Sequence, residues 1–158
     1  MTAISQVTPS GGWALGGLLE TIAITNQTAD STAVSKYITV PPSARYATFV
    51  VNLTMTGTTP TFDFNIRGHL GAASPDDADL FLLGAGWDGI TQKTGATDTY
   101  TTVHIGPDIA TDDTGSATAS DAYGVGAPLP PILAYTYTTT GVDDDEDYSG
   151  TISVSFRR

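Results

Sequence analysis

The chain has 158 residues, 17 Asp and Glu against 6 Lys and Arg, a formal net charge of −11 and no cysteine. This length predicts one domain, and a hydrophobic content of 40% is sufficient for a packed core. The lack of cysteine excludes disulfide scaffolds, zinc ribbons, iron–sulfur clusters and thiol catalysis. Six scattered basic residues are too few to bind the phosphate backbone of a nucleic acid, so we expect no nucleic-acid partner.

The inventory of side chains predicts an all-β protein. Of the 17 acidic residues 15 are Asp, and Thr occurs 27 times. Glu, Lys, Gln and Arg, which cover the solvent face of helices, are scarce, whereas Thr, Val, Ile, Tyr and Phe suit a half-buried pleated surface. No segment keeps a helical period for three turns.

Residues 1–17 are expected to form an extended N-terminal arm, because Pro9 and four glycines disfavour regular structure there. Trp13 and Leu15 are the apolar anchors of this segment. It is either a frayed terminus or an arm that docks Trp13 on a neighbouring chain. The start of the chain lacks the basic and apolar segments of a signal peptide, and no apolar run could span a bilayer. We therefore expect synthesis in a cytoplasm and no membrane partner.

Apolar residues then recur with a period of two along most of the chain. The strands this predicts cover residues 19–25, 34–40, 45–55, 61–67, 80–83, 97–105, 132–138 and 151–156. The turn at 56–60 predicts a hairpin between the third and fourth of these runs, and 106–127 is expected to be a long polar connection. Seven or eight strands with turns between them predict a β-sandwich, jelly-roll-like, over residues 18–158.

Catalytic chemistry has few candidates in this sequence. Nucleophilic catalysis needs a base held against a hydroxyl or thiol, and the two histidines, His69 and His104, lie near no nucleophile elbow or oxyanion-forming sequence. The acidic residues cluster side by side in loops with little apolar surface to perturb their pKa values. We therefore expect no enzyme, and a small hydrolase that uses paired Asp residues is the third hypothesis.

Calcium is the more serious alternative, because it takes oxygen ligands from Asp side chains and loop carbonyls. The best candidates are Asp143, Asp144, Asp145 and Asp147 in the acidic segment 142–148. The spacing of an EF-hand loop is absent, so the favoured interpretation is a solvated hairpin tip whose like charges discourage edge pairing. The prediction is no cofactor, with Ca²⁺ as the alternative.

Carbohydrate binding would need aromatic side chains exposed on a sheet face or at loop tips. The eligible residues are Trp87, Tyr100, Tyr123, Tyr135, Tyr137 and Tyr148. Half-buried aromatic residues of a sandwich have the same sequence pattern, and we favour that interpretation.

Six segments of the chain combine strand and turn patterns in a distinctive order. They are Ala47-Thr-Phe-Val-Val-Asn-Leu-Thr54, Gly57-Thr-Thr-Pro-Thr-Phe-Asp-Phe64, Val103-His-Ile-Gly-Pro107, Ala127-Pro-Leu-Pro130, Ile132-Leu-Ala-Tyr-Thr-Tyr137 and Thr151-Ile-Ser-Val-Ser-Phe156. Together these segments resemble small structural proteins of tailed-bacteriophage particles. The resemblance covers roughly residues 20–158 and consists of strand and turn patterns. The acidic insertion at 143–147 and the terminal Arg157-Arg158 depart from it.

The resemblance implies a non-enzymatic β-sandwich protein of the virion, such as a capsid decoration (cement) protein on the outer surface of the head. Its implied partner is the major capsid protein, and capsid symmetry implies a homotrimer. The expected assembly contacts are Trp13, Leu15 and the loop around Tyr123. The alternative is a carbohydrate- or host-surface-binding module of a phage tail or head fibre.

Overall fold

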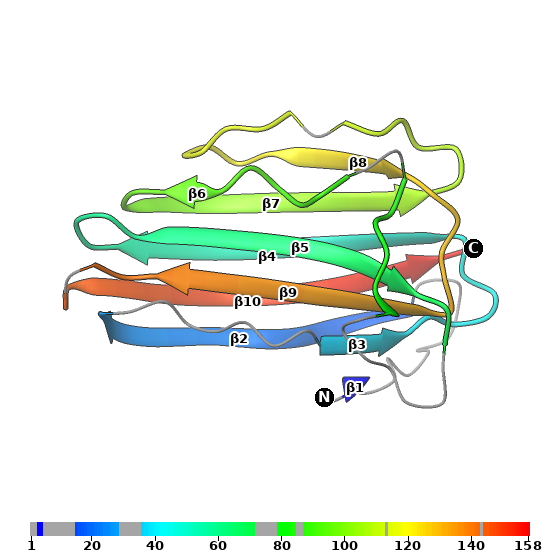
Figure 1. The fold of residues 1–158 in the computed structure, drawn as a ribbon, viewed down its shortest axis with the longest axis horizontal. Helices are drawn as coiled ribbons and strands as arrows, with labels where there is room; N and C mark the ends of the chain where they lie inside the picture. The colour runs from blue at the N-terminus through cyan, green and yellow to red at the C-terminus, as the bar shows by residue number, and fades with distance from the viewer. Residues whose placement is uncertain are drawn as a thin grey trace.

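The computed structural model describes residues 3–4, 15–28, 36–71, 79–84, 87–112, 114–142 and 144–158. In this part of the chain there are ten strands and no α-helix, and hence no helix that is long and apolar enough to cross a membrane. The strands are β1 (Ala3–Ile4), β2 (Leu15–Gln27), β3 (Lys36–Thr39), β4 (Tyr46–Thr56), β5 (Thr61–His69), β6 (Lys93–Thr94), β7 (Thr97–Gly106), β8 (Ala122–Gly126), β9 (Ile132–Thr140) and β10 (Glu146–Arg157). The long strands lie along the long axis of the molecule (Figure 1).

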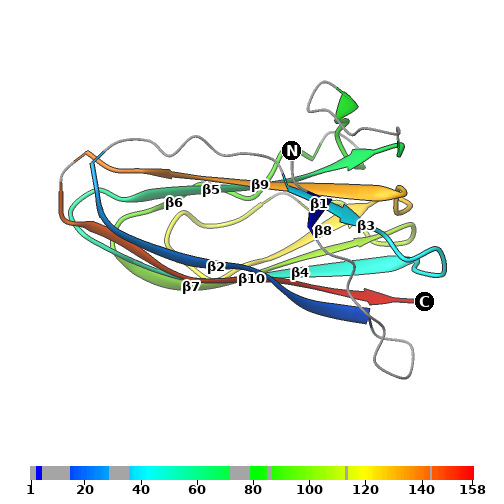
Figure 2. The same cartoon turned by 90° about the horizontal axis from the view of Figure 1, so that it is seen from below.

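The strands form two five-stranded sheets, in the orders β1-β3-β9-β5-β6 and β2-β10-β4-β7-β8. Figure 2 shows the two sheets stacked face to face. The last strand, β10, lies between β2 and β4, and β9 lies between β3 and β5. In each sheet, a strand from the C-terminal part of the chain is therefore inserted between two strands from the N-terminal part. This double insertion is the connectivity of a jelly roll. The predicted all-β sandwich of jelly-roll type is confirmed.

The predicted hairpin between residues 45–55 and 61–67 is wrong, because β4 and β5 belong to different sheets. β4 pairs with β10 along eleven residues and with β7 along nine, so neither of its edges is free for β5. The turn between them instead crosses from one sheet to the other. Phe49 of β4 faces Phe64 of β5 across the core, with ring centroids 6.3 Å apart. Alternation reveals which side chains point inward, and it does not specify the partner strand.

The inward faces predicted from alternation form the core. Along β4, every second residue from Ala47 to Met55 is at most 2% exposed, and Phe62, Phe64 and Ile66 of β5 are equally buried. On the sheet of β4, the neighbouring strand β10 adds three inward residues to the core: Ile152, Val154 and Phe156. The sheets are therefore joined by an aromatic-rich apolar layer, which contributes most of the stabilisation of a sandwich.

Two boundaries differ from the sequence expectation. β2 begins at Leu15, so residues 15–17 belong to the sandwich and not to the arm. The expected connection 106–127 contains β8, which pairs in parallel with β7. β8 was missed because two of its five residues are glycines, which conceal the alternation of Tyr123 and Val125. A glycine is needed at 124, where a Cβ would lie 2.3 Å from the carbonyl oxygen of Ala110.

Candidate functional site

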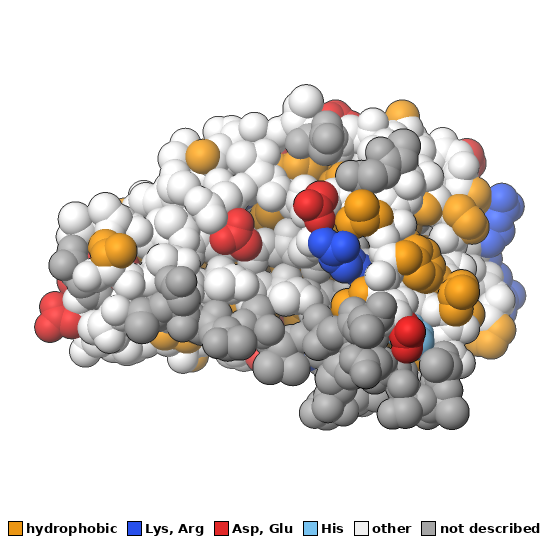
Figure 3. Space-filling model, viewed as in Figure 1, with side chains coloured by type: hydrophobic (Ala, Val, Ile, Leu, Met, Phe, Trp, Pro, Cys, Tyr) orange, Lys and Arg blue, Asp and Glu red, His pale blue; other side chains and the backbone are white. Residues whose placement is uncertain are grey.

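One end of the sandwich carries a concentration of apolar side chains. The groove there has a volume of about 520 Å³ and is lined by Leu70, residues 81–84 and residues 126–131. Leu70, Leu82 and Phe81 are 78%, 42% and 36% exposed. Hydrophobic side chains gather on this end, where β5 ends and β9 begins (Figure 3). We call Leu70, Phe81, Leu82, Pro128, Leu129 and Pro131 the apolar end patch.

The fold holds this patch in place through backbone contacts. Phe81 exchanges two backbone hydrogen bonds with Gly68, at 2.9 and 3.0 Å. A Cβ at Gly68 would lie 2.5 Å from the Phe81 ring, so the ring occupies the space that a side chain would need. The Pro131 carbonyl accepts a hydrogen bond from the Val40 N–H at 2.9 Å, which ties the proline-rich segment to the end of β3. The apolar side chains are therefore presented by ordered backbone.

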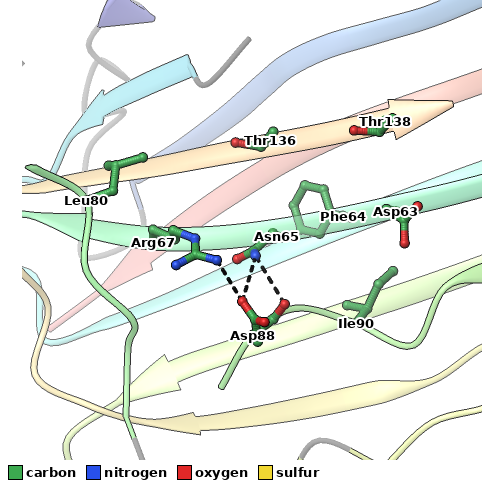
Figure 4. A pocket seen from close by; sticks show the side chains of 9 residues that line it. All are labelled: Asp63, Phe64, Asn65, Arg67, Leu80, Asp88, Ile90, Thr136 and Thr138. Atoms are coloured by element: carbon green, nitrogen blue, oxygen red, sulfur yellow. Dashed lines mark hydrogen bonds and ion pairs between the residues drawn. The ribbon is translucent and has the colours of Figure 1, made fainter. Parts of the chain in front are cut away.

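A second, polar groove runs along the outer face of β5, with a volume of about 460 Å³. We call it the β5 groove. Its lining residues are Asp63, Phe64, Asn65 and Arg67 of β5, Thr136 and Thr138 of β9, and Leu80, Asp88 and Ile90 of the segment between β5 and β6. Asp63, Asn65 and Arg67 are alternate residues of one strand, so they project from the same face. Figure 4 shows the threonines along the neighbouring strand.

Asp88 organises the polar groups of the β5 groove. Its Oδ1 lies 2.7 Å from Arg67 Nη2, and its backbone carbonyl and Oδ1 accept hydrogen bonds from Asn65 Nδ2 at 3.1 and 3.4 Å (Figure 4). Gln92 Nε2 donates to Asp63 Oδ2 at 2.7 Å. The side chains of Arg67 and Asp88 are 35% and 72% exposed, so the pair faces solvent. These contacts fix the orientation of charged groups that are open to a ligand.

A third polar cluster lies between the two sheets, at the edge formed by β2 and β3. Glu20 accepts hydrogen bonds from Lys36 Nζ and, at 3.0 Å, from the hydroxyl of Tyr135. Burial, and then the neighbouring Glu20 carboxylate, raise the pKa values of Tyr135 and Tyr137. The hydroxyls of both tyrosines therefore keep their protons beyond the ordinary range of tyrosine, and Lys36 forms an ion pair with Glu20 at this edge of the sandwich.

The two histidines lie in different environments. His69 is 1% exposed; its Nδ1 accepts the Gly71 N–H at 2.9 Å, and its Nε2 lies 3.7 Å from Asp79 Oδ2. His104 lies on the outer face of β7, with Nδ1 3.1 Å from Thr48 Oγ1 of the neighbouring β4. The structure therefore does not bring the histidines together.

The acidic segment 142–148 makes structural contacts. Glu146 is fully buried and accepts hydrogen bonds from Thr59 N, Thr59 Oγ1 and Val142 N. The expectation of a solvated tip is therefore wrong for Glu146, whose carboxylate links the β9–β10 turn to the β4–β5 turn.

The Ca²⁺ candidates do not converge in the described residues. Asp145 accepts from Thr58 Oγ1 at 2.8 Å and Asp147 from Asn26 N at 2.9 Å, while Asp144 is exposed. Asp143 lies outside the described residues. In the part of the chain that the structure describes, no three His, Asp or Glu side chains form a group that could hold a metal ion.

Sequence reasoning missed the role of Lys93. This residue is 1% exposed and donates to Ser116 O, Ala119 O and Asp121 Oδ2 at 2.8, 2.7 and 2.5 Å. Burial acts to raise the pKa of Asp121, but the hydrogen bonds from Lys93 and from Ser116 N outweigh it and lower that pKa. Lys93 thereby orders the loop that leads into β8. A single lysine in a polar segment carries no sequence signal for such a position.

Comparison with known proteins assigns no family. No family model matches the sequence, and no curated protein is significantly similar to it. Similar solved structures include an exo-beta-agarase, with 10% identity and a TM-score of 0.36 over 98% of this chain and 24% of the agarase. Another is PfGH50B, with 11% identity and a TM-score of 0.34 over 88% of this chain and 22% of PfGH50B. A third is CorA, a surface-associated copper-binding protein of Methylomicrobium album BG8, with 10% identity and a TM-score of 0.30 over 100% of both chains. The chain spans about a quarter of the length of the first two, and TM-scores this low assign neither fold nor function.

The expected assembly residues are only partly placed by the structure. Trp13 lies outside the described residues, and the backbone of Leu15 pairs with Phe156 at the start of β2. Tyr123 is 1% exposed, and its hydroxyl oxygen accepts the Thr91 N–H at 3.0 Å. The expectation that Tyr123 is a surface contact is corrected, because its ring is part of the core between the sheets.

The aromatic residues considered for carbohydrate stacking are mostly core residues as well. Trp87, Tyr123, Tyr135 and Tyr148 are at most 1% exposed, whereas Tyr100 is 54% exposed on the outer face of β7. The favoured interpretation, aromatic side chains buried in a sandwich, is therefore confirmed for these four. These four buried residues cannot stack on a ligand, whereas the β5 groove offers exposed polar groups on a sheet face.

Proposed function

We propose that this chain is a non-enzymatic structural protein of a bacteriophage particle, which binds the outer surface of the capsid and stabilises it. The phage assignment comes from the resemblance of the strand and turn segments, and the geometry supports an adhesive role. The single observation that carries the proposal is the apolar end patch.

The composition of the end patch favours a protein partner. Large apolar side chains that gather on one part of a surface mark interaction sites, whereas isolated ones do not. Leu70, Leu82 and Phe81 lie together with Leu129 and two prolines, Pro128 and Pro131. Burying a fully exposed leucine or phenylalanine contributes about 1.5–3 kcal/mol. Leu70, at 78% exposed, has most of this area left to cover, and Leu82 and Phe81 add smaller contributions.

The rigidity of the sandwich suits repeated docking. β10 forms long ladders with both β2 and β4, so its backbone is paired on both sides. A surface on such a framework loses little conformational entropy on binding. On a particle with many equivalent sites, modest contacts add up through avidity.

The acidic charge is consistent with this role. A net charge of −11 keeps separate molecules apart before assembly and away from DNA. The proposed partner is the major capsid protein, and the proposed assembly is a homotrimer, whose closed symmetry matches a threefold position of a capsid. Both follow from the resemblance.

The test is binding of the purified protein to undecorated phage heads, measured by co-sedimentation, with location and symmetry determined by electron microscopy. Leu82→Ser removes a side chain that is 42% exposed from the end patch, and we expect it to weaken binding by about 3- to 10-fold. The matched control is Val142→Ser: Val142 is 63% exposed and follows β9 at the opposite end of that strand. Equal binding by both variants, or no binding of the wild type to heads, would show that the proposal is wrong.

A further inference from the structure

The β5 groove has the chemistry of a site for a hydroxyl-rich ligand. Within about 460 Å³ it combines carboxylates (Asp63, Asp88), a guanidinium (Arg67), an amide (Asn65) and threonine side chains. This volume falls in the range of small-molecule sites, roughly 300–1,000 Å³. We propose that the β5 groove binds a neutral saccharide. This site is separate from the end patch, and the inference does not depend on the proposed function.

The charges of the groove decide between neutral and anionic ligands. Its two carboxylates, Asp63 and Asp88, outnumber its one guanidinium, Arg67, so the groove carries a formal charge of −1 (−2 + 1). The chain as a whole carries −11. Phosphates, sulfated glycans and uronates would be repelled by both. A neutral sugar has no such penalty, and its hydroxyls both donate and accept hydrogen bonds.

The polar groups are held in position before a ligand arrives. Arg67 contacts Asp88 through Nη2, and its side chain is 35% exposed, so the rest of the planar guanidinium is available as donors. Asp88 uses Oδ1 for both Arg67 and Asn65 and is 72% exposed, which leaves Oδ2 as an acceptor. A guanidinium beside a carboxylate presents donors and acceptors side by side, as adjacent hydroxyls of a sugar require. Such preorganisation reduces the entropy lost on binding.

Apolar side chains complete the groove. Leu80 and Ile90 line it beside the polar residues, and the Ile90 N–H donates to the Phe64 carbonyl of β5 at 3.1 Å, which anchors the segment against the sheet. A pyranose ring exposes C–H groups on its faces and hydroxyls around its edge. Small-molecule sites combine apolar walls with a few fixed polar groups, and here the aliphatic Leu80 and Ile90 supply the apolar wall in place of the exposed aromatic side chain that a carbohydrate site was expected to need.

The experiment is an NMR titration of the full-length protein with cellotetraose, maltotetraose, laminaritetraose and mannotetraose as neutral probes and tetragalacturonate as the anionic one. We expect at least one neutral probe to shift the amide signals of Asn65, Arg67 and Thr138. Arg67→Ala should weaken that binding about tenfold or more, because it removes hydrogen bonds from a charged donor. Arg45→Ala, which removes a cation that lies over the Tyr46 ring, is the matched control and should bind like the wild type.

Thr138→Val keeps the shape of its side chain, removes a hydroxyl from the groove and provides the second variant if Arg67→Ala fails to fold. It should also weaken binding. No shift with any neutral probe, binding of the anionic probe alone, or undiminished binding by folded Arg67→Ala and Thr138→Val would each overturn the inference. Because phage heads are not used, these outcomes are independent of the capsid assay.

Discussion

Replacing Lys93 by methionine tests how a buried cation orders the loop before β8. The substitution keeps an unbranched side chain of similar length and removes three hydrogen bonds, to Ser116 O, Ala119 O and Asp121 Oδ2. Breaking a buried ion pair costs about 3–5 kcal/mol. Asp121 retains 16% exposure and the hydrogen bond from Ser116 N, so we expect about 3 kcal/mol, at the lower limit.

The measurement is urea unfolding at neutral pH, followed by circular dichroism. In a thermal unfolding experiment followed by the same signal, a loss of about 3 kcal/mol lowers the melting temperature of a chain of this size by roughly 6–12 °C. Arg45→Met is the control, because Arg45 is exposed and its loss should change stability by less than about 0.5 kcal/mol. In Lys93→Met/Asp121→Asn, part of the loss should be recovered, because the unpaired carboxylate is removed.

The pH dependence has a definite sign. The pKa of Asp121 is lowered in the folded protein, so its contribution to stability is present above the unfolded pKa of about 3.9 and is lost as pH falls from there toward the folded pKa. The difference between wild type and Lys93→Met should therefore narrow below about pH 4. A cost under about 1 kcal/mol at neutral pH, or a difference that is constant down to acidic pH, would refute this reasoning.

Three further outcomes are expected. Tyr148→Phe should lower the free energy of unfolding by about 1–2 kcal/mol, measured by urea unfolding, because the Tyr148 hydroxyl lies 2.6 Å from the Thr140 carbonyl oxygen and also contacts the Thr61 backbone. Gly57→Ala should cost about 1–3 kcal/mol in the same assay, because φ is 122° and the new Cβ would lie 2.8 Å from a carbonyl oxygen; Gly17→Ala, where no atom lies within 4 Å, is the control. Removal of residues 1–14 should leave the sandwich folded, as judged by circular dichroism, and weaken attachment to phage heads; full-strength attachment would contradict the arm hypothesis.

Local sequence determined the class of this fold and the sides of its strands. Alternation depends only on neighbouring residues, so the inward positions of β4, β5 and β10 were predictable without any knowledge of their partners. The turn residues then located most strand ends, and the number of strands indicated a sandwich.

Only the tertiary structure decided which strands pair and what the polar residues do. The turn after β4 is compatible with a hairpin or with a crossing of the sandwich, and the long ladders of β4 with β7 and β10 select the crossing. The acidic segment that contains Glu146 was expected to be solvated, and Lys93 has no sequence signal. Both side chains are nevertheless buried, because groups distant in sequence donate hydrogen bonds to Glu146 and accept them from Lys93. The end patch and the β5 groove are likewise assembled from separate segments. Such contacts depend on non-local packing, to which the period of a strand is insensitive.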